Sequence, residues 1–213
     1  MSHPDLTEFY FLRHAPAIKK GGHLPDLDAP ITEHDHDHDI ESISVQLPDD
    51  ADWHLSPLQR ARQTAALLTP EPTSTRMVID NDLAEMSFGA WHGQPIADVW
   101  PQIPATPRHN WSFIMPETTP PGGENFVSLH DRVSKWMRRQ ERLPARRPQI
   151  IVTHAGVMRA AMCHILGLDL VTGLGLDIPN LALLRARLME PSRATDAGGP
   201  WQFVGLSRPE SRR

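Results

Sequence analysis

The segment Phe9–His14 places the tightest constraint on how this 213-residue chain can fold. An apolar, aromatic-rich run from Phe9 to Leu12 leads directly into Arg13 and His14. Such a run is typical of a strand buried on both faces of a parallel sheet, and it would place the polar pair at the carboxyl edge, where open α/β folds bind ligands. Arginine binds phosphate oxygens through its forked guanidinium, and histidine can act as a nucleophile near neutral pH. Alone, the pair is a weak signal, and a surface pair without a function explains it equally well.

A second apolar strand also ends in a histidine. The run Gln149–Thr153 is followed by His154, and a helix is predicted from Ala155 to about Leu166. His154 would therefore lie beside a helix amino terminus, which attracts anions. A packed structural histidine is the alternative, but two strands that end in histidine within one sheet favour a shared site.

Arg60 lies near the amino-terminal end of another predicted helix. This helix opens at Ser56-Pro57, a capping residue followed by a proline, and runs to about Leu68. A cation at that end opposes the helix dipole unless an anion binds there as well. A solvated helix arginine is the alternative reading.

Glu85 lies in the segment 82–93, whose glycines and large aromatics predict an ordered loop of the kind that carries function. Its neighbours Ala84 and Met86 are apolar, and partial burial there would favour the protonated form of the carboxyl. Glu85 is therefore a candidate proton donor. An exposed loop carboxylate without a role is the alternative.

The rest of the chain predicts an α/β protein in one domain that spans residues 1–213. Further strands are expected at 52–55, 75–79, 181–189 and 201–206, the last two as a hairpin around 196–199, and a helix is expected from 122–125 to about Arg142. The Pro- and Trp-rich stretch 95–121 predicts a short helix at 96–100 and then an irregular insertion, which either shapes a substrate pocket or forms a passive lid. The tail 207–213 is expected to be disordered.

Histidine and aspartate alternate from His34 to Asp39. Imidazole and carboxylate groups are common metal ligands, so the run could bind a metal. The segment lacks an apolar scaffold to hold ligands in a fixed geometry, which favours a solvated polar loop or the start of a helix.

The composition narrows the choice of partners and compartment. The net charge of −5 supplies no basic field for nucleic acid or anionic membranes. No apolar run approaches the roughly 20 residues that span a bilayer. The amino terminus lacks signal-peptide features, and the single cysteine, Cys163, fits a reducing compartment. We therefore expect a cytoplasmic protein whose partner is a small molecule, with a homodimer left open.

Five segments carry a family resemblance, and they occur in the family's own order. They are Leu12-Arg13-His14, residues 56–65 from Ser-Pro onward, residues 83–93, Gly122-Gly123-Glu124-Asn125 and Val152-Thr153-His154-Ala155-Gly156. Through these five segments, the sequence resembles the histidine phosphatase superfamily, also called the phosphoglycerate mutase-like family. The Glu-x-x-Phe-Gly-x-Trp segment and the short chain are similar to the alpha-ribazole phosphatase type within it.

The resemblance implies a three-layer α/β/α sandwich with a mostly parallel sheet, and no metal or other cofactor. It implies that His14 is phosphorylated, that Arg13, Arg60, His154 and Ala155 bind phosphate, and that Glu85 donates the proton. The expected activity is hydrolysis of a small phosphomonoester, with alpha-ribazole 5′-phosphate as one candidate. A mutase-type phosphotransferase and a non-catalytic module that binds a phosphorylated ligand are the alternatives.

The sequence departs from the family pattern after the nucleophile position. The family usually has glycine there, followed by glutamate or glutamine and a threonine, whereas this chain has Ala15-Pro16-Ala17. Any side-chain contact to phosphate from that turn is therefore lost. His92 also stands where the family frequently has glutamate. These departures bear on the substrate rather than on the catalytic set.

Overall fold

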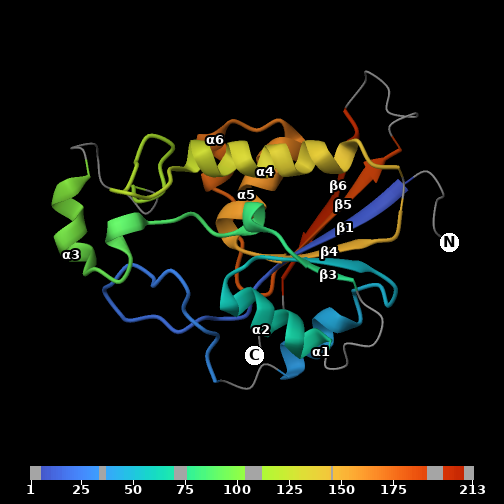
Figure 1. The fold of residues 1–213 in the computed structure, drawn as a ribbon, viewed down its shortest axis with the longest axis horizontal. Helices are drawn as coiled ribbons and strands as arrows, with labels where there is room; N and C mark the ends of the chain where they lie inside the picture. The colour runs from blue at the N-terminus through green and yellow to red at the C-terminus, as the bar shows by residue number, and fades with distance from the viewer. Residues whose placement is uncertain are drawn as a thin grey trace.

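The computed structural model describes residues 6–33, 37–69, 76–103, 112–144, 146–190 and 199–208. Within them, a six-stranded sheet lies between two layers of helices (Figure 1). One face is covered by α4 (Phe126–Glu141), α5 (Ala155–Leu166) and α6 (Leu170–Leu174), and the other by α1 (Asp37–Ser44) and α2 (Gln59–Leu68). The expected three-layer α/β/α sandwich is confirmed.

The sheet is mixed but mostly parallel. Its strands lie in the order β3 (Met77–Ile79), β2 (Asp52–Leu55), β4 (Gln149–Thr153), β1 (Leu6–Arg13), β5 (Leu183–Met189) and β6 (Trp201–Ser207). The first four run parallel to one another, while β5 and β6 are antiparallel to their neighbours. The four parallel strands therefore share one carboxyl edge, where a site can form.

Strand β1 is buried on both faces, which explains its unbroken apolar run. Phe9 and Phe11 face the core beneath α4 and α5, where the Trp136 ring meets both of them edge-on. Tyr10 and Leu12 face the core beneath α1 and α2. Because side chains alternate across a strand, each helical layer takes every second residue of β1.

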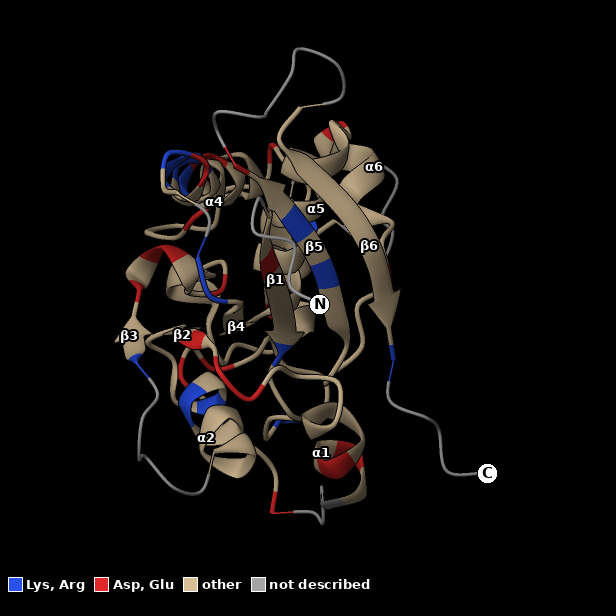
Figure 2. Cartoon of the chain, turned by 90° about the vertical axis from the view of Figure 1, so that its right-hand side faces the viewer, with Lys and Arg blue, Asp and Glu red and all other residues tan. Residues whose placement is uncertain are grey.

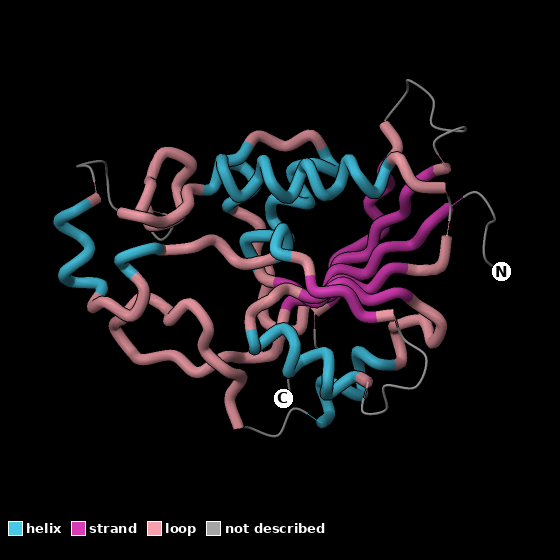
Figure 3. Tube along the Cα trace, viewed as in Figure 1, coloured by secondary structure: helices cyan, strands magenta, loops and turns pink. Residues whose placement is uncertain are grey.

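The register between β1 and β4 fixes where the two histidines lie. Arg13 pairs with Thr153, so His14 and His154 leave the sheet at the same edge. The His14 amide donates to the Thr153 carbonyl at 2.9 Å, which extends the ladder by one residue. Figure 3 shows the long loops gathered at the end of the sheet opposite the amino terminus.

Helix α2 begins later than the sequence indicates. Its first residue is Gln59, and the residue before it, Leu58, makes no side-chain cap. The Ser56 hydroxyl accepts from the Leu58 amide at 3.2 Å and is also bound to His154, so the prediction that Ser56 opens the helix was wrong. Arg60 consequently lies at the second helical position.

The carboxyl-terminal strands also differ in their bounds from the expectation. Strand β5 begins at Leu183, because Leu181 has a φ of 60° and cannot continue a strand. Strand β6 runs through Ser207, so the prediction that a disordered tail begins at residue 207 was wrong at that residue. Residue 75 of the third expected strand, residues 196–198 of the hairpin turn and residues 209–213 lie outside the described residues.

Helix α4 begins at Phe126, with Asn125 as its cap. The Asn125 Oδ1 accepts from the Ser128 amide at 2.9 Å, which satisfies one of the free amides of the first turn. Arg138 and Arg139 lie in its last turn, where the ribbon is blue in Figure 2 and where cations complement the helix dipole. The helix thus ends close to the expected residue.

The segment 95–121 is described in part. It contains α3 (Ile96–Val99), close to the helix predicted at 96–100, and then a 3₁₀ turn at Trp100–Gln102 that the sequence did not indicate. Residues 104–111 lie outside the described residues. In Figure 1, α3 stands beyond the end of the sheet, on the side where the loops gather.

The alternating histidines and aspartates are also described only in part. His38 and Asp39 lie in α1, whereas residues 34–36 are outside the described residues. Among the residues that are described, no group of three or more metal-ligating side chains converges. Within the same residues, the helices are too short or too polar to cross a membrane.

Candidate active site

His14 leaves strand β1 with its ring fixed in one orientation. Its Nδ1 lies 2.6 Å from the Ala15 carbonyl oxygen, and Arg60 Nε donates to its Nε2 at 3.2 Å. A carbonyl can only accept and a guanidinium can only donate, so Nδ1 carries the proton and Nε2 the lone pair. Burial lowers the pKa of His14 to about 3, and the positive charges of Arg60 and Arg13 act in the same direction. The imidazole is therefore neutral at physiological pH.

Two guanidiniums flank this ring. Arg60 is buried and also donates from NH1 to the Leu27 carbonyl at 2.9 Å. Arg13 donates from NH1 to the Ile178 carbonyl at 2.5 Å, while its buried Nε has no partner among the described residues. Burial lowers the pKa of both arginines, and the charge of Glu85 partly offsets this. Although the net charge of the chain is −5, two guanidiniums lie together at this site.

His154 lies directly behind His14. The ring centroids are 5.0 Å apart, and His154 is fully buried. Its Nε2 lies 2.6 Å from the Ser56 hydroxyl, and its Nδ1 has no partner within the described part of the chain. Burial, followed by the charges of His14 and Arg60, lowers the pKa of His154 well below the usual value. His154 Nδ1 and Arg13 Nε are thus two buried polar atoms of this region that have no hydrogen-bond partner among the described residues, as expected where a polar ligand binds.

Glu85 approaches the amino terminus of α5. Its Oε2 accepts from the Gly156 amide at 3.3 Å, and its Oε1 accepts from the Met86 amide at 3.0 Å. A Cβ at position 156 would collide with Glu85 Oε1, so the glycine lets the carboxylate lie against the helix. Ala155 is the first residue of α5, and its amide is one of the first-turn donors that the helix itself leaves free.

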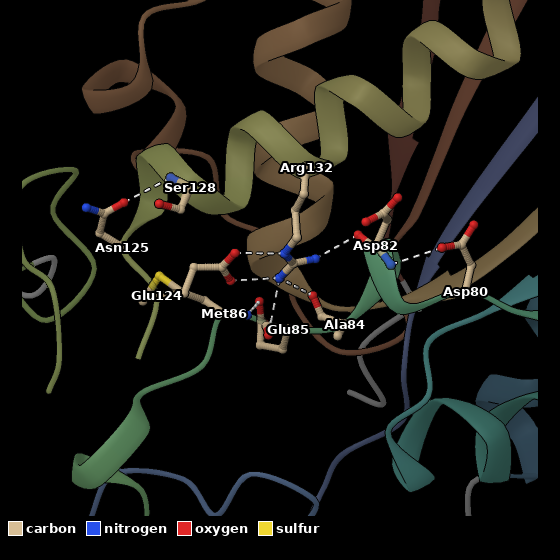
Figure 4. A network of polar contacts seen from close by, with 9 residues as sticks. All are labelled: Asp80, Asp82, Ala84, Glu85, Met86, Glu124, Asn125, Ser128 and Arg132. Carbon is tan, nitrogen blue, oxygen red and sulfur yellow. Dashed lines mark hydrogen bonds and ion pairs between the residues drawn. The ribbon is translucent and has the colours of Figure 1, made fainter. Parts of the chain in front are cut away.

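Arg132, on α4, holds the loop that carries Glu85 (Figure 4). Its NH1 donates to the Asp82 carbonyl and its NH2 to the Ala84 carbonyl, each at 2.7 Å, with a longer contact of 3.4 Å to the Glu85 carbonyl. Nε and NH2 also bind the two carboxylate oxygens of Glu124 at 2.8 Å. The backbone at the candidate acid and just before it is thus fixed to one guanidinium.

Two further residues support the turn after His14. The Thr64 hydroxyl accepts from the Ala15 amide at 2.9 Å and donates to the Arg60 carbonyl at 2.7 Å, which couples the turn to α2. The Asn180 side chain donates to the His14 carbonyl at 2.9 Å. Sequence reasoning missed Thr64, Asn180 and Arg132. Only Thr64 carries a local signal, since it lies four residues after Arg60 on the same helix face.

His92 connects the acid loop to the loop that follows β1. Its Nε2 accepts from the Phe88 amide at 2.9 Å, and its Nδ1 donates to the Pro25 carbonyl at the same distance. Both ring nitrogens thus have a hydrogen-bond partner. The departure from the family pattern at this position therefore has a structural role.

A cavity of about 150 Å³ lies at this site. Arg13, His14, Arg60 and Glu85 open into it, whereas His154 lies behind them and is not part of its wall. The rest of the lining is largely apolar and includes Phe88, Phe126, Leu129 and Ile114, the last from the segment 95–121. The structure therefore brings together the five side chains that the sequence assigned to the phosphate site, and the insertion contributes to the pocket.

The sheet order and helical layers are those of the phosphoglycerate mutase-like α/β proteins. Residues 9–195 match the family model of the histidine phosphatase superfamily (branch 1), and the chain belongs to this superfamily. The family resemblance is thus confirmed.

Known proteins resemble the chain in sequence or in fold. A bifunctional protein of Mycobacterium tuberculosis is 34% identical over 133 residues, which are 62% of this chain and 33% of that protein. The chain thus spans about a third of the length of this curated relative.

Two solved structures share the fold over nearly the whole chain. The mycobacterial glucosyl-3-phosphoglycerate phosphatase has a TM-score of 0.73 and 20% identity, over 93% of this chain and 97% of that one. An Escherichia coli K-12 protein described as a "putative alpha-ribazole-5'-P phosphatase" has a TM-score of 0.71 and 20% identity, over 97% of each chain. At this level of identity, the likeness shows the fold alone.

Proposed function

We propose that this protein hydrolyses a small phosphomonoester through a phosphohistidine intermediate on His14. The observation that carries the proposal is the orientation of the His14 ring, whose Nε2 lone pair lies beside the Arg60 guanidinium in a cavity that Glu85 also lines. A neutral imidazole with its proton held on Nδ1 is a competent nucleophile at Nε2. Membership of the histidine phosphatase superfamily supports the same chemistry.

In the first step, Nε2 of His14 attacks phosphorus as the bond between phosphorus and the alcohol oxygen breaks. Glu85, in its protonated form, gives its proton to the departing oxygen. The Nδ1 proton stays on the ring, held by the Ala15 carbonyl at 2.6 Å. Arg13 and Arg60 line the cavity and stabilise the charge on the transferring oxygens. The family resemblance implies His154 and the Ala155 amide as further phosphate ligands, although neither lines the cavity.

In the second step, the Glu85 carboxylate takes a proton from water, and that water attacks phosphorus. The bond between phosphorus and His14 Nε2 breaks, inorganic phosphate leaves, and Glu85 is again protonated. A mutase would instead pass the phosphoryl group to a second alcohol. Each atom and proton is accounted for by these residues and water, so the scheme requires no metal.

Trapping tests the proposal directly. Brief incubation with a ³²P-labelled phosphomonoester, followed by quenching, should label the protein in a form that is stable to base and labile to acid. The His14→Ala variant should take up no label and should not release phosphate from 4-nitrophenyl phosphate. Label or turnover in that variant would refute the role of His14, and transfer to an added alcohol in preference to water would favour the mutase. Alpha-ribazole 5′-phosphate belongs in the substrate panel, because the sequence resembles that type and an Escherichia coli structure of that description shares the fold.

A further inference from the structure

The candidate pocket contains more positive charge than one phosphoryl group needs. Four basic side chains line it: Arg13, Arg60, Arg159 and Lys19. Two carboxyl groups, Asp26 and Glu85, share the lining. The proposed mechanism begins with Glu85 protonated. In that state the four basic side chains and Asp26 give the lining a net charge of +3, and a phosphate dianion neutralises only two of these positive charges.

Lys19 is the basic residue best placed to meet an additional anion. Arg13 and Arg60 are assigned to the phosphoryl group, and Arg159 is anchored on α5 by a bond of 3.0 Å from its Nε to the Leu176 carbonyl. Lys19, in the loop after β1, is exposed at the rim of the cavity. Within the described part of the chain, no hydrogen bond or ion pair holds its ammonium group.

Lys19 is also electrostatically close to the candidate phosphate site. Partial burial lowers its pKa first, and the positive charges of Arg13 and Arg60 lower it further. Like charges in one pocket repel each other, and an anionic ligand relieves that repulsion. A lysine on a flexible stem can supply such a ligand with a point charge without requiring a fixed geometry.

We propose that Lys19 binds a second anionic group of the substrate, carried on the alcohol that the reaction releases. The inference rests on the proposed function and narrows its substrate to phosphomonoesters whose alcohol bears a carboxylate or a second phosphate. A phosphomonoester of an uncharged alcohol, such as alpha-ribazole 5′-phosphate, would leave Lys19 without a partner.

Matched substrates and matched variants test this directly. 3-Phosphoglycerate and glycerol 3-phosphate differ by a carboxylate in place of a hydroxymethyl group. Lys19→Gln should lower the ratio of their kcat/KM values about tenfold, the effect of losing one hydrogen bond to a charged group. Lys20→Gln is the control, because Lys20 is the adjacent exposed lysine, does not line the cavity, and changes the net charge equally. The ratio in Lys20→Gln should stay within about twofold of wild type.

A second pair, fructose 1,6-bisphosphate and fructose 6-phosphate, distinguishes the two sources of the anion. If Lys19→Gln lowers the kcat/KM ratio only for 3-phosphoglycerate over glycerol 3-phosphate, the second anion is a carboxylate. If it lowers the ratio only for the fructose pair, the second anion is a phosphate, and a lower ratio for both pairs supports the broader class. For a compound that is not turned over, its Ki against 4-nitrophenyl phosphate hydrolysis supplies the same ratio. Equal ratios in wild type and Lys19→Gln for both pairs would overturn the inference. The proposed function fails separately, if the wild-type protein forms no phosphohistidine.

Discussion

Replacing Arg132 by methionine tests whether α4 positions the candidate acid (Figure 4). Arg132 makes a forked pair with Glu124, and its side chain and that of Glu124 are 21% and 19% exposed. It also binds the carbonyls of Asp82 and Ala84. Removing one partner of a buried pair costs about 3–5 kcal/mol, and water can reach part of this network. We therefore expect Arg132→Met to lower the free energy of unfolding by about 2–4 kcal/mol.

The catalytic effect should depend on the leaving group. Arg132 fixes the backbone at Glu85 and just before it, so its loss should displace the proton donor without removing it. A displacement of about 1 Å can cost about a hundredfold in rate. We expect kcat to fall about 10- to 100-fold for an alkyl phosphate, whose leaving oxygen needs the proton, and about threefold or less for 4-nitrophenyl phosphate.

Arg139→Met is the matched control on the same helix. Arg139 is 52% exposed and pairs with Asp82 at 2.6 Å, so its removal should cost about 1 kcal/mol or less and leave Glu85 in place. Urea unfolding would measure the stability of both variants, and steady-state kinetics with the two substrates would measure the rates. If Arg132→Met has the same free energy of unfolding as Arg139→Met and keeps its kcat with the alkyl phosphate, α4 does not hold the loop that carries Glu85.

Three further predictions concern the same site. Because burial lowers the pKa of His14 to about 3 from 6.5, the unfolded chain binds more protons between these values, so stability should rise with pH across that window. The slope in wild type should exceed that in His14→Gln by about 1.4 kcal/mol per pH unit, and urea unfolding at several pH values with equal slopes would contradict the burial argument. Glu85→Gln should slow alkyl phosphates about a hundredfold or more and 4-nitrophenyl phosphate much less, and equal slowing in the same kinetic assay would exclude it as the acid. Dialysis against EDTA should leave the rate of phosphate release unchanged, whereas a large loss restored by a divalent cation would point to a metal, for which the run at 34–39 would be the first candidate.

The sequence predicted the fold class, and it singled out side chains that the structure gathers in one region, because both signals are local. An unbroken apolar run such as Phe9–Leu12 or Ile150–Val152 marks a strand buried on both faces, and the residue that follows it must lie at the sheet edge. The local pattern therefore predicts that His14 and His154 each lie at the end of a strand, and the parallel pairing of β1 with β4 puts both at the same edge. The register of β1 on β4 then sets how close they are.

The sequence was a poorer guide to the ends of the helices and strands and to the contacts that support the site. Ser56 was assigned to open a helix, because its hydrogen bond to a residue 98 positions away is invisible in a local pattern. Arg132 and Asn180 act through backbone carbonyls about 50 and 166 residues distant, and a carbonyl is the same group at every position. No side-chain pattern in the sequence can reveal such partners.

The amino-acid sequence by itself determined that two strands end in histidine, that arginines and a glutamate follow at helix and loop starts, and that the chain is an α/β protein. Only the tertiary structure decided which nitrogen of His14 keeps its proton, that His154 lies behind the pocket wall, and which helix holds the acid loop. The physical reason is that hydrophobic patterning acts between near neighbours in the chain, whereas hydrogen-bond geometry and desolvation depend on groups that meet only after folding.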